Sequence, residues 1–352
     1  MIPLPVLLNA YRLMVNAGAM AATYEANRAV CKYVHSTSRG HEAIQLAAAL
    51  HLLPQDAVSP YYRDESLLLG LGFTPYQLML QLLAKGEDIF TGGREYYAHP
   101  NYREPDKPLI LHQSSATGMQ AIPTTGLAQG IQYLENYLPE KLRKGEGDNP
   151  PVVVCSLGDA SVTEGEVSEA LQVAVLKQLP VIYLVQDNNW GISVSASEAR
   201  AMNAFEMVAG FPGMKRVQVD GSDFEASCQV MKEAYEYVRK ERKPCLVHAQ
   251  VPLLGHHTSG VRKEFYRSEE DLAAHLAHDP VPKLRKKLLE RGVEEEELLR
   301  MEKEANSIIA ADFERAKASH DPDPNTVEDF VFAPSAITAE AGVRAPANAE
   351  KI

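Results

Sequence analysis

One stretch, "PVVVCSLGDASVTEGEVSEALQVAVLKQLPVIYLVQDNNWGIS", constrains the fold of this chain more than any other. It holds two short continuous apolar runs, 151–157 and 180–186, and a helical pattern between them that repeats Val167 and Leu171 on one face. Apolar runs without alternation are typical of strands that are covered on both faces. Two such strands joined by a helix form a parallel βαβ unit, so we expect an α/β fold.

Polar residues follow each of these two strands directly. Asp159 closes the first, and Asp187 and Asn188 close the second. The carboxyl ends of parallel strands lie at the same edge of a sheet, where the helix beginning near Glu166 also turns its positive end. Oxygen ligands suit Mg²⁺, which usually completes its shell with phosphate oxygens and water. The constellation predicts a Mg²⁺-diphosphate site, although each Asp alone would be an ordinary turn former.

The alternation of strands and helices continues after this unit. The stretches 215–221 and 244–253 predict two more strands, with the helix 223–242 between them. Helical patterns follow at 282–291 and 294–317. We therefore expect a doubly wound, mainly parallel sheet with helices on both faces.

Other parts of the chain carry weaker signals. The first fifty residues read as helices, and a short helix is expected from Pro75, capped by Thr74 and ending at Gly86. The rest of 54–110 and the polar segment from 255 to 279 are expected to be irregular. From Asp321 the composition becomes rich in Pro, Ala and acidic residues, which predicts one domain over 1–320 and a linker-like tail over 321–352.

Composition excludes several classes of protein. The net charge of −12, with no basic stripe, argues against a nucleic-acid partner. Four cysteines without a CxxC pattern fit a reducing, cytoplasmic location and no zinc site. The N-terminus reads as an amphipathic helix instead of a signal peptide, and no apolar run is long enough to span a membrane.

Several motifs in order carry a family resemblance. "GDASVTEGE…LPVIYLVQDNNWGIS" resembles the thiamine diphosphate motif, which runs from Gly-Asp-Gly to a later Asn pair. With "GHEAI", "YYRDE", "HQSSATGMQ" and "GHHTSGVRKEFYRSEED", the chain resembles the α subunit of the decarboxylating component of 2-oxo acid dehydrogenase complexes over residues 5–320. The resemblance implies the thiamine diphosphate-binding fold, with thiamine diphosphate and Mg²⁺ as cofactors.

The resemblance also implies a set of metal ligands. Asp159 matches the acidic Mg²⁺ ligand of the motif, and Asn188 matches the second ligand. The third ligand would be the backbone carbonyl of Trp190, so the identity of that side chain is free to vary.

The motif is matched with two departures. Gly158 corresponds to the glycine that lets the backbone approach the diphosphate, but the usual third residue, Gly, is Ala160 here. The usual first Asn of the pair is Asp187. Neither change removes a ligand, but Asp187 adds a negative charge that Mg²⁺ and basic groups must offset.

Further positions match cofactor-binding residues of the family. Tyr62 and Arg63 match the Tyr-Arg pair on the diphosphate, and the planar fork of an arginine suits phosphate oxygens. Ser115 and Thr117 match positions that hold the aminopyrimidine. Glu164 matches an acidic residue near the diphosphate. The alternatives are a surface ion pair for Arg63 and a helix-start carboxylate for Glu164.

A histidine pair precedes the polar loop near residue 260. The resemblance implies that this loop folds over the cofactor and that His257, after His256, reaches the diphosphate and the reaction intermediate. Both histidines are predicted catalytic residues, because a histidine can donate to phosphate or shuttle a proton near neutral pH. A metal site or a plain surface loop is the alternative. Thr258 and Ser259 occupy the region that is phosphorylated in relatives with a regulating kinase.

The implied activity is decarboxylation of a 2-oxo acid and transfer of the acyl group to a lipoyl-bearing acyltransferase core. The implied partner is a β subunit in an α₂β₂ assembly, which supplies the activating glutamate, so the chain alone should not turn over. "GHHTS" and "FYRS" favour branched-chain substrates such as 2-oxoisovalerate, with pyruvate and acetoin as alternatives. The tail resembles the connector of fused α-β chains, which leaves fused and separate forms open.

Two rival functions were weighed. A catalytically silent scaffold would be indicated by loss of Arg63, Asp159 or Asn188, and all three are present. A Mg²⁺-dependent phosphotransferase would need a nucleophile or a glycine-rich phosphate loop, and neither GxxxxGK[ST] nor GxGxxG occurs in the chain.

Overall fold

The computed structural model describes residues 2–329 apart from 34, 112–113, 144 and 146–148. Its centre is a sheet of six strands in the order β2-β1-β3-β4-β8-β7, and every neighbouring pair runs parallel. The strands are β1 (Ala57–Ser59), β2 (Leu109–Ile110), β3 (Val153–Gly158), β4 (Val181–Asp187), β7 (Lys215–Asp220) and β8 (Cys245–Gln250).

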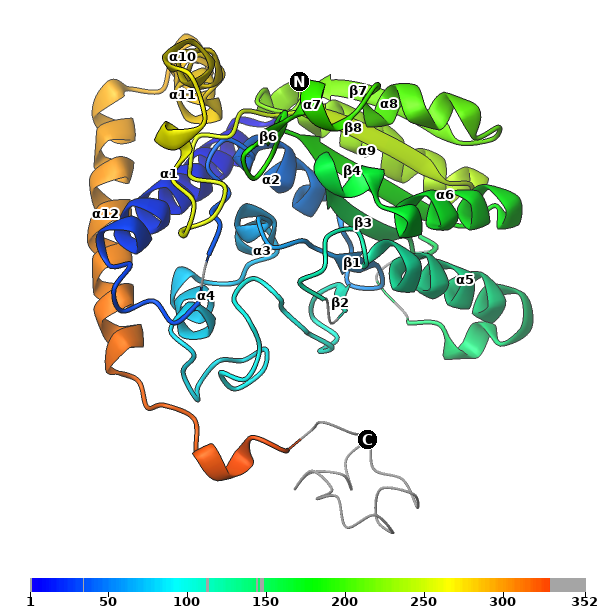
Figure 1. Cartoon of the computed structure of the whole chain (residues 1–352), viewed down its shortest axis with the longest axis horizontal. Helices are drawn as coiled ribbons and strands as arrows, with labels where there is room; N and C mark the ends of the chain where they lie inside the picture. Colours follow the sequence, from blue (N-terminus) through cyan, green and yellow to red (C-terminus); the bar gives the residue numbers. More distant parts are fainter. Residues whose placement is uncertain (1, 34, 112–113, 144, 146–148, 330–352) are drawn as a thin grey trace.

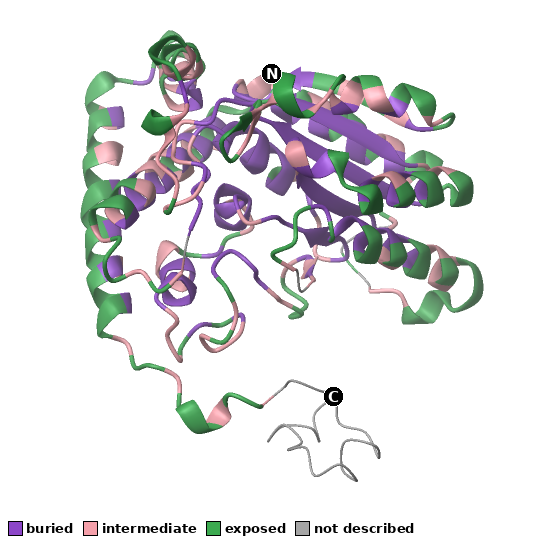
Figure 2. Ribbon diagram, viewed as in Figure 1, coloured by how far each residue is buried: buried purple, intermediate pink, exposed green. Residues whose placement is uncertain are grey.

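Helices cover both faces of this sheet (Figure 1). One face packs against α5 (Ala121–Tyr137) and α6 (Gly165–Lys177), and the other against α2 (Glu42–His51) and α9 (Phe224–Glu241). The strands are buried between these layers, while the outer faces of the helices are exposed (Figure 2). The predicted fold class, a doubly wound parallel sheet, is confirmed.

The remaining helices extend the α2 side of the molecule or lie at its rim. The long helices α1 and α12 pack against each other there (Figure 1). The bounds are α1 (Leu4–Ala26), α3 (Glu65–Gly70), α4 (Pro75–Leu82), α7 (Ala196–Ala199), α8 (Ala204–Met207), α10 (Glu269–Leu276), α11 (Pro280–Glu290) and α12 (Glu295–Ala318).

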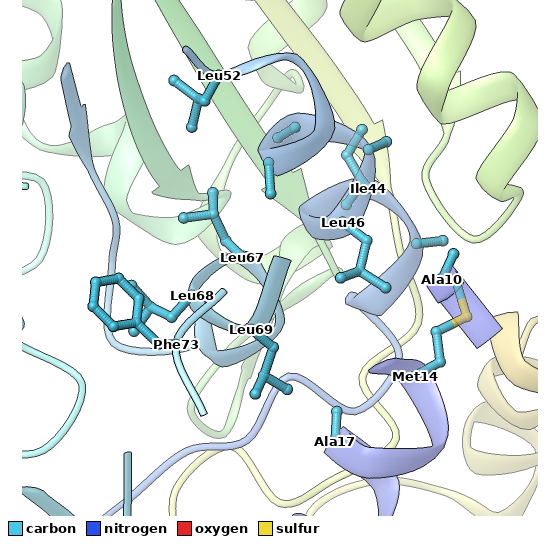
Figure 3. Packing of buried hydrophobic residues seen from close by; sticks show 14 of the residues in the cluster. Ala10, Met14, Ala17, Ile44, Leu46, Leu52, Leu67, Leu68, Leu69 and Phe73 are labelled. Atoms are coloured by element: carbon cyan, nitrogen blue, oxygen red, sulfur yellow. The ribbon is translucent and has the colours of Figure 1, made fainter. Parts of the chain in front are cut away.

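The core on the α2 side anchors a short turn that the site uses. Figure 3 shows side chains of α1, α2 and α3 meeting there, among them Met14, Ile44 and Leu67. These side chains are fully buried, and each contributes roughly 1.5–3 kcal/mol of burial free energy. Because α3 is fixed in this core, the turn that precedes it, with Tyr62 and Arg63, is held at the edge of the sheet.

Two parts of the chain differ from the expected structure. Strands β1 and β2 and helix α3 lie within the segment predicted to be irregular, and α10 lies within the predicted loop 255–279. Strands of two and three residues are fixed by pairing with neighbours, as Ala57 pairs with Val153, and carry no periodicity of their own. Helix α10 has no buried residue, although Leu272 and Leu276 share one face at i, i+4 spacing, and Ser268 caps its first turn by accepting from Asp271 N.

The short helix at Pro75 is confirmed, with Thr74 and Gln77 forming a reciprocal capping box, although it ends at Leu82 instead of Gly86. The tail lies against the 85–94 segment as far as it is described: Lys85 Nζ donates to Asp321 Oδ1 at 2.9 Å, and Arg94 Nε donates to Thr326 O at 3.2 Å. Residues 330–352 of the predicted linker lie outside the described residues, and the domain boundary stays a prediction. No helix in the described parts of the chain has both the length and the apolar character to cross a membrane.

Candidate active site

The carboxyl ends of β3 and β4 form the base of a cleft. In the parallel register Gly158 lies opposite Gln186, so Asp159 and the Asp187–Asn188 pair follow at the same edge. The cleft holds about 480 Å³ of space, part of it open to solvent. Its lining includes ten of the predicted site residues: Tyr62, Arg63, Ser115, Thr117, Gly158, Asp159, Ala160, Asn188, Trp190 and His257.

Two predicted site residues do not line this cleft. Glu164 is the residue before α6, behind a 3-10 turn (η2, Ala160–Thr163) that separates Asp159 from the helix. His256 lies in a neighbouring hollow, with Nε2 4.0 Å from Glu25 and Nδ1 3.8 Å from Glu264. The structure therefore brings only one of the two predicted catalytic histidines, His257, to the site.

Arg63 is the most unusual residue in the lining. It is only 1% exposed, and its Nη2 donates to the backbone oxygen of His257 at 3.2 Å. Among the described residues, its Nε and Nη1 have no hydrogen-bond partner. A buried guanidinium with unpaired N–H groups is costly unless an anion accepts from them. The arrangement fits a diphosphate group at this position.

His257 connects the polar loop to the rest of the cleft. Its Nε2 lies 3.3 Å from the hydroxyl of Tyr62, and the backbone N–H of Ile192 points at its ring at 3.3–3.4 Å. Burial, with the positive charge of Arg63, lowers the pKa of His257 to about 3. The imidazole is therefore neutral at pH 7, with one N–H to donate.

Asn188 is oriented by contacts with Trp190 and with His41, and His41 was not among the predicted site residues. Its Nδ2 lies 3.2 Å from His41 Nε2, and its Oδ1 accepts from Trp190 N at 3.0 Å. His41 is fully buried, and its Nδ1 donates to Gln186 Oε1 at 2.8 Å. Burial and the charge of Arg63 lower the pKa of His41, so it is neutral and accepts from the amide. The motif "GHEAI" was the available signal for His41.

The two strand-end carboxylates share one arginine. Arg200 Nη1 donates to Asp159 Oδ2 at 2.6 Å, and Nη2 donates to Asp187 Oδ1 at 2.7 Å. Burial and the charge of Asp187 raise the pKa of Asp159, and Arg200 offsets only part of this. Within the described residues, hydrogen bonds reach only Oδ2 of Asp159, so its Oδ1 is free for a hard cation. Asp159 and Asn188 thus fit a Mg²⁺ site. No sequence motif had indicated Arg200 as a residue of this site.

The loop that carries Ser115 and Thr117 packs closely at Gly118 against the turn that follows β3. This residue has φ +84°, and a Cβ there would lie 3.0 Å from Ser161 O and from the Glu164 side chain. We expect Gly118→Ala to lower the unfolding free energy by about 1–3 kcal/mol, because both the backbone conformation and the contact become strained. Chemical denaturation measures this. Gly126→Ala, which meets nothing within 4 Å, is the control and should not destabilise.

An outer chamber adjoins the cleft and shares Tyr62, Ser115, Thr117, Ala160 and His257 with it. Its remaining lining includes Tyr96, Tyr97, His99 and Ile192, and it holds about 1140 Å³ up to its open mouth. His99 Nε2 lies 3.1 Å from the Ser115 hydroxyl. The aromatic-rich stretch 93–102 thus supplies part of the wall of this chamber.

Comparison with known proteins finds one matching family model and relatives that are named as α subunits of dehydrogenases. Residues 11–325 match the family model described as "Dehydrogenase E1 component". The 2-oxoisovalerate dehydrogenase subunit alpha 2 of Arabidopsis thaliana is 28% identical over 71% of this chain and 49% of its own length. The 3-methyl-2-oxobutanoate dehydrogenase subunit alpha of Mycobacterium tuberculosis is 29% identical over 74% of this chain and 64% of its own length.

The pyruvate dehydrogenase E1 component subunit alpha of Rhizobium meliloti is similar to the same degree, at 29% identity over 82% of this chain and 78% of that protein. The chain therefore spans between about half and four fifths of the length of these relatives. The resemblance carried by the sequence motifs is confirmed, and it implies dependence on thiamine diphosphate. On these grounds the chain belongs to the dehydrogenase E1 component family, with the α subunits of 2-oxo acid dehydrogenases.

Proposed function

We propose that this chain is the α subunit of a branched-chain 2-oxo acid dehydrogenase that binds thiamine diphosphate through Mg²⁺. One observation carries the proposal: Arg63, buried and with two N–H positions that no described residue pairs, lines the same cleft as Asp159 and Asn188. An anion receptor beside hard-cation ligands is the arrangement that a metal-bound diphosphate requires.

The residues of the cleft divide the work of binding. Arg63 and Tyr62 hold the diphosphate, while Asp159, Asn188 and the carbonyl of Trp190 hold Mg²⁺. Gly158 and Ala160 bring the backbone of the same turn close to the phosphate. Ser115 and Thr117 hold the aminopyrimidine. The neutral ring of His257 donates one hydrogen bond toward the diphosphate or the substrate from the loop above the cleft.

The cofactor, when bound, supplies a carbon nucleophile and an acceptor for the electron pair released by decarboxylation. The chain itself fixes the orientation of the cofactor and covers it from water. Tyr62, Trp190 and His257 are at most partly exposed and lie around the cleft. Exclusion of water strengthens each polar contact inside the site.

A β subunit is the proposed partner, and the active assembly is an α₂β₂ heterotetramer in the cytoplasm. The acyl group passes to a lipoyl-bearing acyltransferase core. We expect the isolated chain to show no steady turnover, because the family resemblance assigns the activating glutamate to the β subunit. The assay is decarboxylation of 2-oxoisovalerate with a dye acceptor, with and without co-expressed β; steady turnover by the isolated chain would contradict the division of labour.

The decisive test of cofactor binding is calorimetry on the α/β complex. Thiamine diphosphate with Mg²⁺ should bind, and ATP with Mg²⁺ should not. Binding of ATP would favour the phosphotransferase alternative. A complex that binds neither ligand would favour a silent scaffold.

The outer chamber favours a branched substrate over pyruvate. It is lined by large side chains such as Tyr96, Tyr97 and Ile192, and an apolar wall gains free energy from additional methyl groups. We expect kcat/KM of the α/β complex for 2-oxoisovalerate to exceed that for pyruvate by at least about tenfold. Steady-state kinetics measures the ratio. A preference for pyruvate or acetoin would move the chain to those substrate classes without changing the cofactor site.

A further inference from the structure

Arg200 joins the two strand-end carboxylates, and no role proposed above requires it. Its Nη1 donates to Asp159 Oδ2 at 2.6 Å, and its Nη2 donates to both oxygens of Asp187, at 2.7 and 2.8 Å. The side chains of Arg200, Asp159 and Asp187 are only 10%, 5% and 5% exposed. A buried guanidinium between two buried carboxylates is a specific arrangement, because each partner would be costly to leave unpaired.

The contacts of the two carboxylates differ. Asp187 Oδ1 accepts from Arg200 and from Asn189 N at 3.0 Å, and its Oδ2 accepts from Arg200 and lies 2.9 Å from His248 Nε2. An ionised carboxylate has about four acceptor positions, so protein donors occupy those of Asp187. Asp159 receives a hydrogen bond from Arg200 only, as far as the chain is described. The cluster thus leaves one carboxylate, Asp159, to face a cation.

The charge of the cluster matches that of a simpler site. When both carboxylates are ionised, as cation binding requires, Asp159 and Asp187 contribute two negative charges and Arg200 one positive charge, so the net charge is −1. An Asp159 beside a neutral Asn at position 187, the residue that the motif usually has there, would give the same net charge. A second uncompensated carboxylate would instead repel the diphosphate at short range.

Arg200 also closes the loop that carries the other candidate ligands. The loop leaves β4 at Asn188, forms the small hairpin β5 (Trp190–Gly191) and β6 (Val194–Ser195), and returns through α7. Ala196 N donates to Asn189 O at 2.9 Å, and Arg200 N donates to Ala196 O at 3.0 Å. The ion pairs of Arg200 therefore tie the end of the loop to its beginning, with Trp190 held between them.

We propose that Arg200 is a positioning residue of the Mg²⁺-diphosphate site: it neutralises Asp187 and pins the 188–200 loop. This inference rests on the proposed function. It explains how the chain tolerates an acidic residue where the motif has Asn, since Asp187 and Arg200 together replace one neutral amide.

The test is a double-mutant cycle in the α/β complex. Calorimetry measures thiamine diphosphate affinity at fixed Mg²⁺, and electron paramagnetic resonance measures binding of Mn²⁺ alone. Arg200→Met should weaken cofactor binding by at least about tenfold, because the loop loses its anchor and the second carboxylate is exposed to the diphosphate. Asp187→Asn should weaken Mn²⁺ binding by about tenfold, because Arg200 then has only Asp159 as a partner.

The double variant, Asp187→Asn with Arg200→Met, restores the charge of one carboxylate beside an amide. Its cofactor affinity should exceed that of Arg200→Met, because the charge balance is restored although the loop still lacks its anchor, whereas independent effects would multiply. Arg200→Lys, which keeps the charge without the fork, should fall between the wild type and Arg200→Met. Arg300→Met is the matched control, because its contacts with Glu297 and Glu304 lie on an exposed helix face.

Each outcome decides the inference. The inference is overturned if Arg200→Met binds the cofactor with wild-type affinity. It is also overturned if the loss of cofactor affinity in the double variant equals the product of the losses in the two single variants. Thermal unfolding checks that each variant is folded; if Arg200→Met does not fold, the comparison of Asp187→Asn with the double variant decides instead. A wild-type complex that fails to bind thiamine diphosphate would refute the proposed function itself, so the two failures are distinguishable.

Discussion

Replacing Arg63 with Met should lower the affinity of the α/β complex for thiamine diphosphate by at least about 100-fold, while the cofactor-free protein becomes more stable. Two hydrogen bonds to a charged group contribute about 1.5–3 kcal/mol each, and about 3 kcal/mol corresponds to roughly 100-fold in affinity. Without an anion, Nε and Nη1 of Arg63 are buried and unpaired, and each such donor costs about 1–3 kcal/mol.

The opposite signs make this prediction specific. Calorimetry measures the affinity, and chemical denaturation without cofactor measures a gain in unfolding free energy of about 1–3 kcal/mol. Arg63→Lys keeps the charge but loses the planar fork, so it should bind with intermediate affinity. If Arg63→Met binds thiamine diphosphate normally, Arg63 does not hold the diphosphate, and the observation on which the proposed function depends is lost.

Replacing Asp159 with Asn should abolish most of the Mg²⁺-dependent binding. Mutation of a residue that hydrogen-bonds to a metal ligand typically lowers metal affinity about 10- to 100-fold. Loss of a directly ligating carboxylate should therefore lower the affinity for Mg²⁺ by at least about 100-fold. Burial and the charge of Asp187 raise the pKa of Asp159, so a neutral amide there should not destabilise the cofactor-free fold. Titration of the complex with Mg²⁺ at fixed thiamine diphosphate measures the effect.

Asp220→Asn is the matched control for this experiment. Asp220 ends strand β7, as Asp159 follows strand β3, but it pairs with Lys283 at 3.0 Å and does not line the cleft. Its replacement should leave the Mg²⁺ dependence unchanged. Unaltered cofactor affinity in Asp159→Asn would refute the assignment of the metal site.

The central βαβ unit could be predicted because its patterns are local. Strands β3 and β4 are covered on both faces and are mostly apolar, and the helix between them repeats its apolar residues at helical spacing. The strands β1 and β2 and the helix α10 were missed for the complementary reason. The two strands exist through pairing with distant residues, and α10 buries none of its own.

The residues of the candidate site also fall into two groups: those that a local motif predicted and those that only contacts between distant segments bring together. Asp159 and Asn188 were predicted because they directly follow strands, and Arg63 was predicted because its motif resembles that of the family. His256 was predicted beside His257, but adjacent residues on an extended loop point in different directions, and the structure places it in another hollow. Arg200 lay in no motif, and 41 residues separate it from Asp159.

The parallel sheet, the edge at which a ligand would bind and the oxygen-rich character of that edge could be read from the sequence, because they follow from periodicity and from residues that directly continue a strand. Which side chains share that edge, and with what net charge, depends on how distant segments pack. The pairing of Arg200 with two carboxylates, the burial of Arg63 without a full set of partners and the orientation of Asn188 by His41 all join segments distant in the chain. Such contacts depend on packing and leave no periodic trace in the sequence.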